Sequence, residues 1–202
     1  MSEIKAVIFD WGGVLVDNPR AGLVEYCSKG LGVAEKNYLK AYHKFDEAFH
    51  KGQLSEDDFW ANMCNELKVD EPNVDSLWGQ AFEAAYSPKE EVFCLIDILK
   101  SNSYKIGFLS NTEEPSVVFF YKQGYDVFDA IVFSCEVGFT KPQKEIYELA
   151  IGKLGVEANQ AVFIDDIPEY IDGAHEAGLN GIVFKDIEQL KNDLEILGVK
   201  VN

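Results

Sequence analysis

Five short apolar runs restrict the fold of this chain of 202 residues more than any other feature. Each is rich in Val, Ile and Phe and only about five residues long, which is typical of strands buried on both faces of a sheet. The runs cover residues 6–9, 105–109, 130–133, 161–164 and 181–184. Helical patterns separate the later runs. Strand alternating with helix predicts an α/β fold with a Rossmann-like, doubly wound parallel sheet.

The ends of several expected helices can be read from the sequence. The segment Ser87-Pro88-Lys89-Glu90 has the spacing of a capping box with proline at the first helical position. It predicts a helix that begins there and continues to about Lys100. Two further helices are expected over residues 142–154 and 170–177, the second followed by Gly178 as a C-terminal cap.

One long segment breaks the alternation of strand and helix. Between the first two apolar runs no strand-like run occurs, and the residues show amphipathic helical spacing instead. Ser55, three residues before Asp58, is expected to cap one of these helices. We therefore predict a catalytic core formed by residues 1–16 and 88–202, and a helical cap formed by residues 17–87.

Charge and composition exclude several classes of protein. The formal net charge is −17 and Arg20 is the one arginine, whereas nucleic-acid binding needs clustered basic residues, so we expect no nucleic-acid partner. No run of about 18 apolar residues exists, so no membrane span is expected, and the N-terminus does not resemble a signal peptide. The four cysteines are scattered without a C-x-x-C pair, which is typical of reduced thiols in a cytoplasmic protein.

Polar residues follow three of the apolar runs directly. The first run ends in Asp10, the second in Ser110-Asn111-Thr112 and the fourth in Asp165-Asp166. The carboxyl ends of parallel strands meet at one edge of the sheet, so these acids should lie close together and repel one another. A cation that prefers oxygen ligands, such as Mg²⁺, would offset the repulsion. Lys141, just before a helix-starting proline, could supply a second positive charge there.

In this order the polar residues resemble the four motifs of the haloacid dehalogenase superfamily of Mg²⁺-dependent phosphohydrolases. The helical insert lies where this family carries its C1-type cap, and the chain is similar to the sugar-phosphate, glucose-1-phosphatase-like branch. The matching segments are VIFDWGGVL with Asp10, IGFLSNT with Ser110, GFTKPQKEIY with Lys141 and VFIDDIPEYIDGAHEAG with Asp165 and Asp166.

This resemblance implies a role for each residue. Asp10 would attack phosphorus and form an aspartyl phosphate, which divides one difficult displacement into two easier steps. Ser110 and Asn111 would hydrogen-bond the phosphoryl oxygens, and Lys141 would neutralise their charge and orient Asp10. The implied ligands of Mg²⁺ are Asp10, the backbone carbonyl of Gly12, and Asp166, with Asp165 as a direct or water-bridged partner. The expected reaction is hydrolysis of a small phosphomonoester, a sugar phosphate.

Gly12 departs from the family pattern. Most phosphatases of this family have a second aspartate two residues after the nucleophile, which protonates the leaving oxygen and then activates water. Three interpretations follow: a phosphatase that works without this acid, a 2-haloacid dehalogenase, whose leaving halide needs no proton, or a ligand-binding protein without catalysis. The acid pair after the fourth run, Asp165-Asp166, favours the first over the second.

Two features of the cap have a packing role as their expected explanation. His43 and His50 lie two helical turns apart, too far to ligate one metal ion from a continuous helix, and are expected to be exposed or partly packed. Aromatic residues recur at helical spacing between Tyr38 and Phe49, which predicts a stripe in the cap interior. Trp11, beside the nucleophile, could either pack under the cap or shape the substrate cavity.

Overall fold

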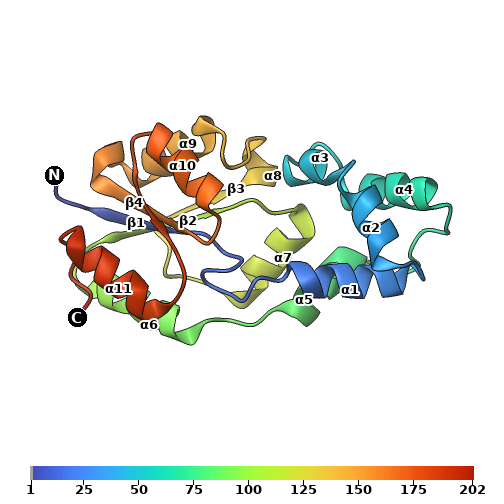
Figure 1. Cartoon of the computed structure of the whole chain (residues 1–202), viewed down its shortest axis with the longest axis horizontal. Helices are drawn as coiled ribbons and strands as arrows, with labels where there is room; N and C mark the ends of the chain where they lie inside the picture. The colour runs from blue at the N-terminus through green and yellow to red at the C-terminus, as the bar shows by residue number, and fades with distance from the viewer. Residues whose placement is uncertain (1) are drawn as a thin grey trace.

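A five-stranded, entirely parallel sheet forms the centre of one half of the molecule (Figure 1). The computed structural model describes residues 2–202, and the strand order in the sheet is β3-β2-β1-β4-β5. The predicted Rossmann-like α/β class and all five predicted strands are confirmed. The strands are β1 (Ala6–Phe9), β2 (Lys105–Ser110), β3 (Ala130–Phe133), β4 (Ala161–Asp165) and β5 (Asn180–Val183).

Helices cover both faces of this sheet (Figure 1). One face packs against α9 (Lys144–Leu154) and α10 (Pro168–Glu176), and the other against α6 (Glu90–Ser101), α7 (Glu114–Gln123) and α11 (Ile187–Ile196). The short helices α8 (Ser134–Val137) and η1 (Ala158–Gln160) lie in the connections. Because apolar side chains leave both faces of each central strand, the sheet is buried between two layers.

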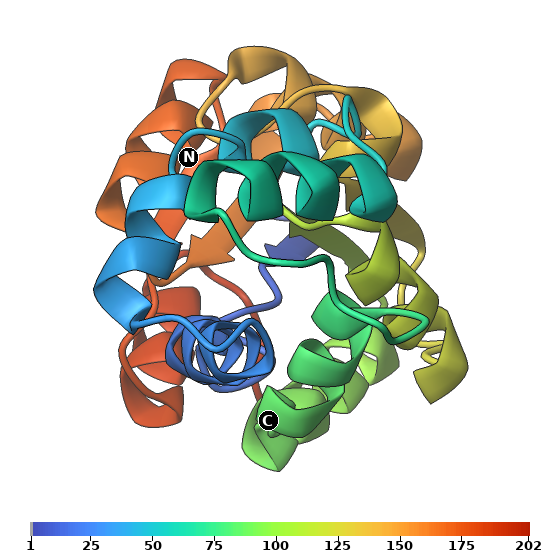
Figure 2. The same ribbon diagram turned by 90° about the vertical axis from the view of Figure 1, so that its right-hand side faces the viewer.

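The segment between β1 and α6 forms a second, helical half. Seen end-on, its helices stand in front of the carboxyl ends of the strands (Figure 2). No strand lies between Asp17 and Ser87, so this segment is helical as predicted, while the exact boundaries of core and cap stay a prediction. Its helices are α1 (Arg20–Gly30), α2 (Glu35–Tyr42), α3 (Asp46–His50), α4 (Glu56–Leu67) and α5 (Leu77–Ala85).

The N-terminal caps of two helices show where local sequence signals succeed and fail. Ser55 caps α4 as predicted, because its Oγ accepts a hydrogen bond from the backbone N–H of Asp58 at 3.1 Å. The predicted capping box at Ser87 is wrong, since α6 begins only at Glu90 and has no side-chain cap. The preceding residues are instead held in an extended conformation by the neighbouring chain segment.

That neighbouring segment is the exit from β1. The N–H of Asp17 donates to the carbonyl of Ser87 at 2.8 Å, and the N–H of Lys89 donates to the carbonyl of Leu15 at 2.9 Å. Val16 forms an antiparallel bridge with Pro88 between these two bonds. The two segments that connect the halves therefore run side by side.

Aromatic packing joins the helical half to the sheet half. The ring of Trp11 is buried, with centroid distances of 4.6 Å to Phe82 of α5, 5.7 Å to Phe108 of β2 and 5.4 Å to Phe120 of α7. Tilted and edge-on ring pairs of this kind are each worth about 0.5–1.5 kcal/mol beyond their buried area.

Of the helices in residues 2–202, none is long and apolar enough to cross a membrane.

Candidate active site

Strand register brings the predicted polar residues to one edge of the sheet. Phe9 at the end of β1 is level with Ile164 of β4, and the N–H of Asp10 donates to the carbonyl of Ile164 at 3.0 Å. Asp10 therefore follows β1 at the same level as Asp165 at the end of β4. On the other side of β1, Ser110 ends β2. The sequence prediction that these residues converge is met by this geometry.

A buried lysine lies between two of the carboxylates. The Nζ of Lys141 is 2.7 Å from Asp10 Oδ1 and 2.5 Å from Asp165 Oδ2. All three side chains are less than 10% exposed, so these ion pairs are shielded from water and salt. Removing Lys141 would leave two buried carboxylates without the cation between them.

Burial dominates the acid–base properties of this group. It raises the pKa of Asp10 to about 7, against the opposing effect of the Lys141 ammonium. Burial also disfavours the charged form of Lys141, but the two carboxylates, Asp10 and Asp165, outweigh it and raise the pKa of Lys141. A divalent cation beside Asp10 would lower its pKa and keep the carboxylate ionised at neutral pH.

The amide of Asn111 fixes the backbone that carries Lys141. Its Oδ1 accepts from the N–H of Lys141 at 2.8 Å, and its Nδ2 donates to the carbonyl of Lys141 at 3.1 Å. The ammonium also lies over the ring of Tyr170, 4.8 Å from its centroid. The Asn111 side chain, predicted to contact phosphate, is therefore bonded to the backbone of Lys141. The hydroxyl of Ser110 makes no side-chain hydrogen bond within residues 2–202 and lines the cavity.

Asp165 and Asp166 differ sharply in their surroundings. Asp165 is completely buried, and its two oxygens bind Lys141 and, at 2.8 Å, the N–H of Ile167. Asp166 is half-buried, and its Oδ1 is enclosed without a hydrogen-bond partner in residues 2–202. Its Oδ2 lies 3.5 Å from Asn18 Nδ2, the limit of a hydrogen bond. Burial, followed by the Asp165 charge, raises the pKa of Asp166.

The donor set fits a magnesium ion. Asp10, Asp165 and Asp166 each place one carboxylate oxygen within 4.8 Å of the others. Gly13 packs against Asp166 with φ of +90°, and a Cβ at this position would lie 2.3 Å from Asp166 Oδ2. Oxygen ligands gathered this closely, one of them enclosed and unpaired, match the preference of Mg²⁺ for carboxylates.

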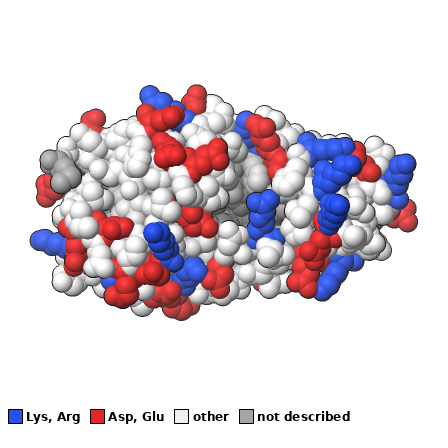
Figure 3. All heavy atoms as spheres, viewed as in Figure 1, with Lys and Arg blue, Asp and Glu red and all other residues white. Residues whose placement is uncertain are grey.

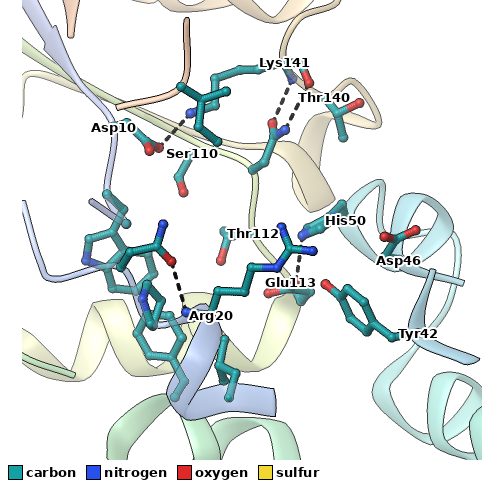
Figure 4. Close-up of a pocket in the computed structure, with 18 of the residues that line it drawn as sticks. Asp10, Arg20, Tyr42, Asp46, His50, Ser110, Thr112, Glu113, Thr140 and Lys141 are labelled. Carbon is teal, nitrogen blue, oxygen red and sulfur yellow. Dashed lines mark hydrogen bonds and ion pairs between the residues drawn. The ribbon is translucent and has the colours of Figure 1, made fainter. Parts of the chain in front are cut away.

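A cavity of about 470 Å³ opens over these residues, between the two halves of the molecule. The space-filling view is hollowed in this region (Figure 3). Asp10, Ser110 and Lys141 lie at the sheet end, and side chains of the cap helices form the opposite end (Figure 4). Gly12 lines the sheet end as well.

The cap end contains a pair of residues that sequence reasoning missed. His50 was expected to be a packed or exposed residue of the cap, yet its Nε2 lies 2.9 Å from Glu113 Oε1, a buried carboxylate of the sheet half. Glu113 also accepts from Trp78 Nε1 at 3.1 Å. No motif pairs residues so distant in the chain, so this contact could not be predicted from spacing.

The aromatic residues of the cap divide between core and cavity. Phe49 is buried and stacks on Phe59, as predicted for an interior stripe. Tyr38 and Tyr42 also line the cavity, which the helical spacing did not indicate. Trp11 combines both of its predicted roles, since it packs beneath the cap and contributes to the cavity wall.

Comparison with known proteins identifies related sequences. A family model described as haloacid dehalogenase-like hydrolase matches residues 4–178. Flavin mononucleotide hydrolase 1 of Arabidopsis thaliana is 29% identical over 204 residues, which cover 99% of this chain and 80% of that protein. D-ribitol-5-phosphate phosphatase of Bacteroides thetaiotaomicron is 31% identical over 192 residues, 87% and 89% of the two chains. Some relatives are longer, and this chain spans 19% of the mouse acyl-CoA dehydrogenase family member 10.

Solved structures share the fold. A HAD family enzyme from Bacteroides thetaiotaomicron has a TM-score of 0.79 at 21% identity, with 96% of this chain and 99% of that chain covered. A structure of the same enzyme in complex with magnesium and inorganic phosphate has a TM-score of 0.75 at 21% identity, with 93% and 98% covered.

Proposed function

Because this chain belongs to the haloacid dehalogenase-like hydrolase family, we propose that it is a Mg²⁺-dependent phosphatase. Its substrate is a small phosphomonoester, a sugar phosphate, and its reaction passes through an aspartyl phosphate on Asp10. The observation that carries the proposal is the buried Lys141, which holds Asp10 at 2.7 Å on the floor of the cavity with the unpaired Asp166 close by. D-ribitol-5-phosphate phosphatase, a relative, is by its name a phosphatase of a sugar-alcohol phosphate.

The first step is a displacement at phosphorus. An oxygen of Asp10 forms a bond to phosphorus while the bond between phosphorus and the ester oxygen breaks. The ester oxygen leaves with the bonding pair as an alkoxide, which takes a proton from water to become the alcohol. Lys141 and the hydroxyl of Ser110 offset the negative charge on the phosphoryl oxygens while the phosphoryl group is transferred. In the second step water attacks phosphorus, phosphate departs and the Asp10 carboxylate is restored.

The metal would be held by Asp10, Asp166 and the carbonyl of Gly12, with Asp165 tied to Lys141 and so placed to act through water. When bound, Mg²⁺ would shield the Asp10 carboxylate from the negative charge of the phosphate that it must approach. Among the residues of this chain, Gly13 makes room for Asp166 and Lys141 fixes the orientation of Asp10.

The simplest test is hydrolysis of p-nitrophenyl phosphate with and without Mg²⁺. This leaving group departs without a proton, so the assay examines Asp10 without needing the acid that Gly12 replaces. A panel of sugar phosphates then identifies the preferred substrate. Hydrolysis that is insensitive to a chelator would contradict the metal-dependent mechanism, and no turnover of any phosphate ester would favour a ligand-binding protein.

The two acids after β4 should respond differently to substitution. Asp166→Ala should raise the Mg²⁺ concentration for half-maximal activity by at least about tenfold, because it removes the oxygen that has no protein partner. Asp165→Asn should raise this Mg²⁺ concentration less. It should instead lower the free energy of unfolding, because Asp165 binds Lys141. Mg²⁺ titrations of activity, direct calorimetric binding and urea unfolding separate the two effects. A larger change in Mg²⁺ affinity for Asp165→Asn would reverse the assignment.

The glycine at position 12 predicts a steep dependence on the leaving group. Since Gly12 offers no proton, aryl phosphates of graded acidity should react faster as the leaving alcohol becomes more acidic, and a sugar 1-phosphate should react faster than the 6-phosphate of the same sugar. The measurement is kcat/KM of the wild-type protein across the series, with chemistry confirmed as rate-limiting. A flat series would mean that another group donates the proton.

Gly12→Asp is the complementary variant. A Cβ on Gly12 would lie 3.1 Å from Pro19 Cδ, so a small shift of the proline ring would admit the aspartate, unlike at Gly13. An added carboxyl group should make kcat/KM depend less on the acidity of the leaving group. It should also raise kcat/KM for simple alkyl phosphates, by about 10²–10⁴-fold at most, the range that general acid–base catalysis provides. A variant that folds and keeps the steep series would show that position 12 does not reach the ester oxygen.

A further inference from the structure

Arg20 lies at the cap end of the cavity, opposite Asp10 and Lys141. It is the first residue of α1, and its side chain points into the cavity toward His50 and Glu113 (Figure 4). The Arg20 guanidinium makes no hydrogen bond or ion pair with any of residues 2–202, whereas its backbone N–H is bonded to Asn18. Arginine presents five N–H donors in a planar fork, so a guanidinium directed into a cavity without a partner is equipped to bind an oxyanion.

The acids around the same end of the cavity already have partners. Each pairs with a basic side chain, at 2.6 to 3.0 Å: Asp46 with His43, Glu47 with Lys51, and Glu113 with His50. These acids are therefore not the partners of Arg20. Arg20 therefore keeps its positive charge without an acid partner among residues 2–202, on a chain whose net charge is −17.

His50 adds to the positive character of this end. Burial would lower the pKa of His50, but the adjacent Glu113 carboxylate outweighs burial and raises it. Glu113 is itself fixed by Trp78 Nε1 and lies in the buried wall of the cavity, so His50 is held in place beside Arg20. A ligand that reaches this end meets Arg20 of α1 and His50 of α3, both from the cap.

Aromatic side chains of the cap, among them Tyr42, Trp78 and Phe82, also line the cavity. A cavity of about 470 Å³ falls within the usual range for small-molecule sites of about 300–1,000 Å³. Lys141 at one end and Arg20 at the other give it two separate positive centres. The two residues line opposite ends of the cavity (Figure 4).

Building on the proposed function, we propose that the substrate of this enzyme carries a second anionic group, a carboxylate or a second phosphate, at the end remote from the phosphate that is hydrolysed, and that Arg20 binds this group. The substrate class is then a phosphorylated sugar acid or a sugar bisphosphate. Arg20 acts as a specificity residue, because it contacts a part of the substrate that does not react. Charge-assisted, bidentate hydrogen bonds of this type discriminate strongly against a neutral group.

Pairs of substrates that differ only in the second group test the inference. 6-Phosphogluconate and sorbitol 6-phosphate differ by a carboxylate in place of a hydroxymethyl group, and glucose 1,6-bisphosphate and glucose 1-phosphate differ by the second phosphate. We expect kcat/KM of the wild type to favour the charged member of one pair by at least about tenfold, from the value of a charged hydrogen bond. The pair with the larger ratio distinguishes the carboxylate from the phosphate.

Arg20→Gln should lower kcat/KM for the charged member by about 10- to 100-fold and for the neutral member by less than about threefold. Arg20→Lys, which keeps the charge but loses the fork, should fall in between. Lys36→Gln is the matched control, because it removes one positive charge from an exposed position of the cap outside the cavity. Equal losses on both members, or no preference by the wild type in either pair, would overturn the inference.

The second anionic site can be tested separately from the proposed phosphatase activity. Turnover of p-nitrophenyl phosphate tests the phosphatase activity alone. If that turnover is absent, calorimetric binding of the same pairs to the wild type and to Arg20→Gln still tests the second anionic site. Tighter binding of the charged member that Arg20→Gln removes supports the site, and equal binding of both members contradicts it.

Discussion

Replacement of Asp10 by Asn should abolish phosphoester hydrolysis while the protein remains folded. The amide keeps the shape of the carboxylate at the end of β1, but it cannot attack phosphorus. By comparison with other covalent nucleophiles, kcat should fall by at least about 10⁴-fold. Lys141 would keep its bond to Asp165 at 2.5 Å, so the local structure retains one of its two ion pairs.

The measurement is kcat for p-nitrophenyl phosphate, together with thermal unfolding to show that the variant is folded. Asp172→Asn provides the matched control, because Asp172 is an exposed acid of α10 outside the cavity. It should retain wild-type activity. Activity of Asp10→Asn within tenfold of the wild type would contradict the assignment of the nucleophile, as would the absence of a phosphorylated Asp10 when wild-type protein is trapped during turnover.

Replacement of Lys141 by Met should remove both activity and much of the stability. Methionine fills a similar volume, but it leaves the buried carboxylates of Asp10 and Asp165 without the cation between them. Breaking a buried charge pair by removing one partner costs about 3–5 kcal/mol, because the remaining charge stays buried and uncompensated. The phosphate would also lose its positive centre at the sheet end of the cavity.

Urea unfolding of Lys141→Met and wild type measures the change in the free energy of unfolding. Lys36→Met, at an exposed site of α2, is the control and should change the free energy of unfolding by less than about 0.5 kcal/mol. A loss of less than 1 kcal/mol for Lys141→Met, on the order expected for a surface pair, would show that Lys141 is not central to this cluster. Retention of catalysis would contradict its proposed role toward phosphate.

The sheet could be predicted from the sequence because each strand is marked by a short local run of apolar residues. Runs such as residues 6–9 are apolar throughout, and the acid after them, Asp10, lies at the only edge where parallel strands can bring such residues together. The failure at Ser87 has a physical cause. Its capping pattern is correct locally, but backbone hydrogen bonds with the exit from β1 compete for the same residues and hold them extended.

Contacts between the two halves were beyond sequence reasoning for a different reason. His50 and Glu113 belong to separate helical regions, and neither lies in a motif or in a periodic pattern that points to the other. The hydrogen bonds by which the Asn111 amide holds the Lys141 backbone likewise depend on how two loops approach each other in space. Such contacts follow from the assembled fold, and a single sequence carries no record of them.

The paired connections between the halves have a consequence for how enzymes of this architecture can diversify. Because Leu15 and Asp17 are bonded to Lys89 and Ser87, the chain leaves the sheet and returns to it at one point. A longer, shorter or unrelated insertion grafted between these anchors would leave the spacing of β1 and β2 unchanged. The residues proposed to react stand on the sheet, whereas Arg20 and His50 stand on the insertion. If these proposals hold, evolution can exchange the part that selects the substrate while the catalytic residues are kept.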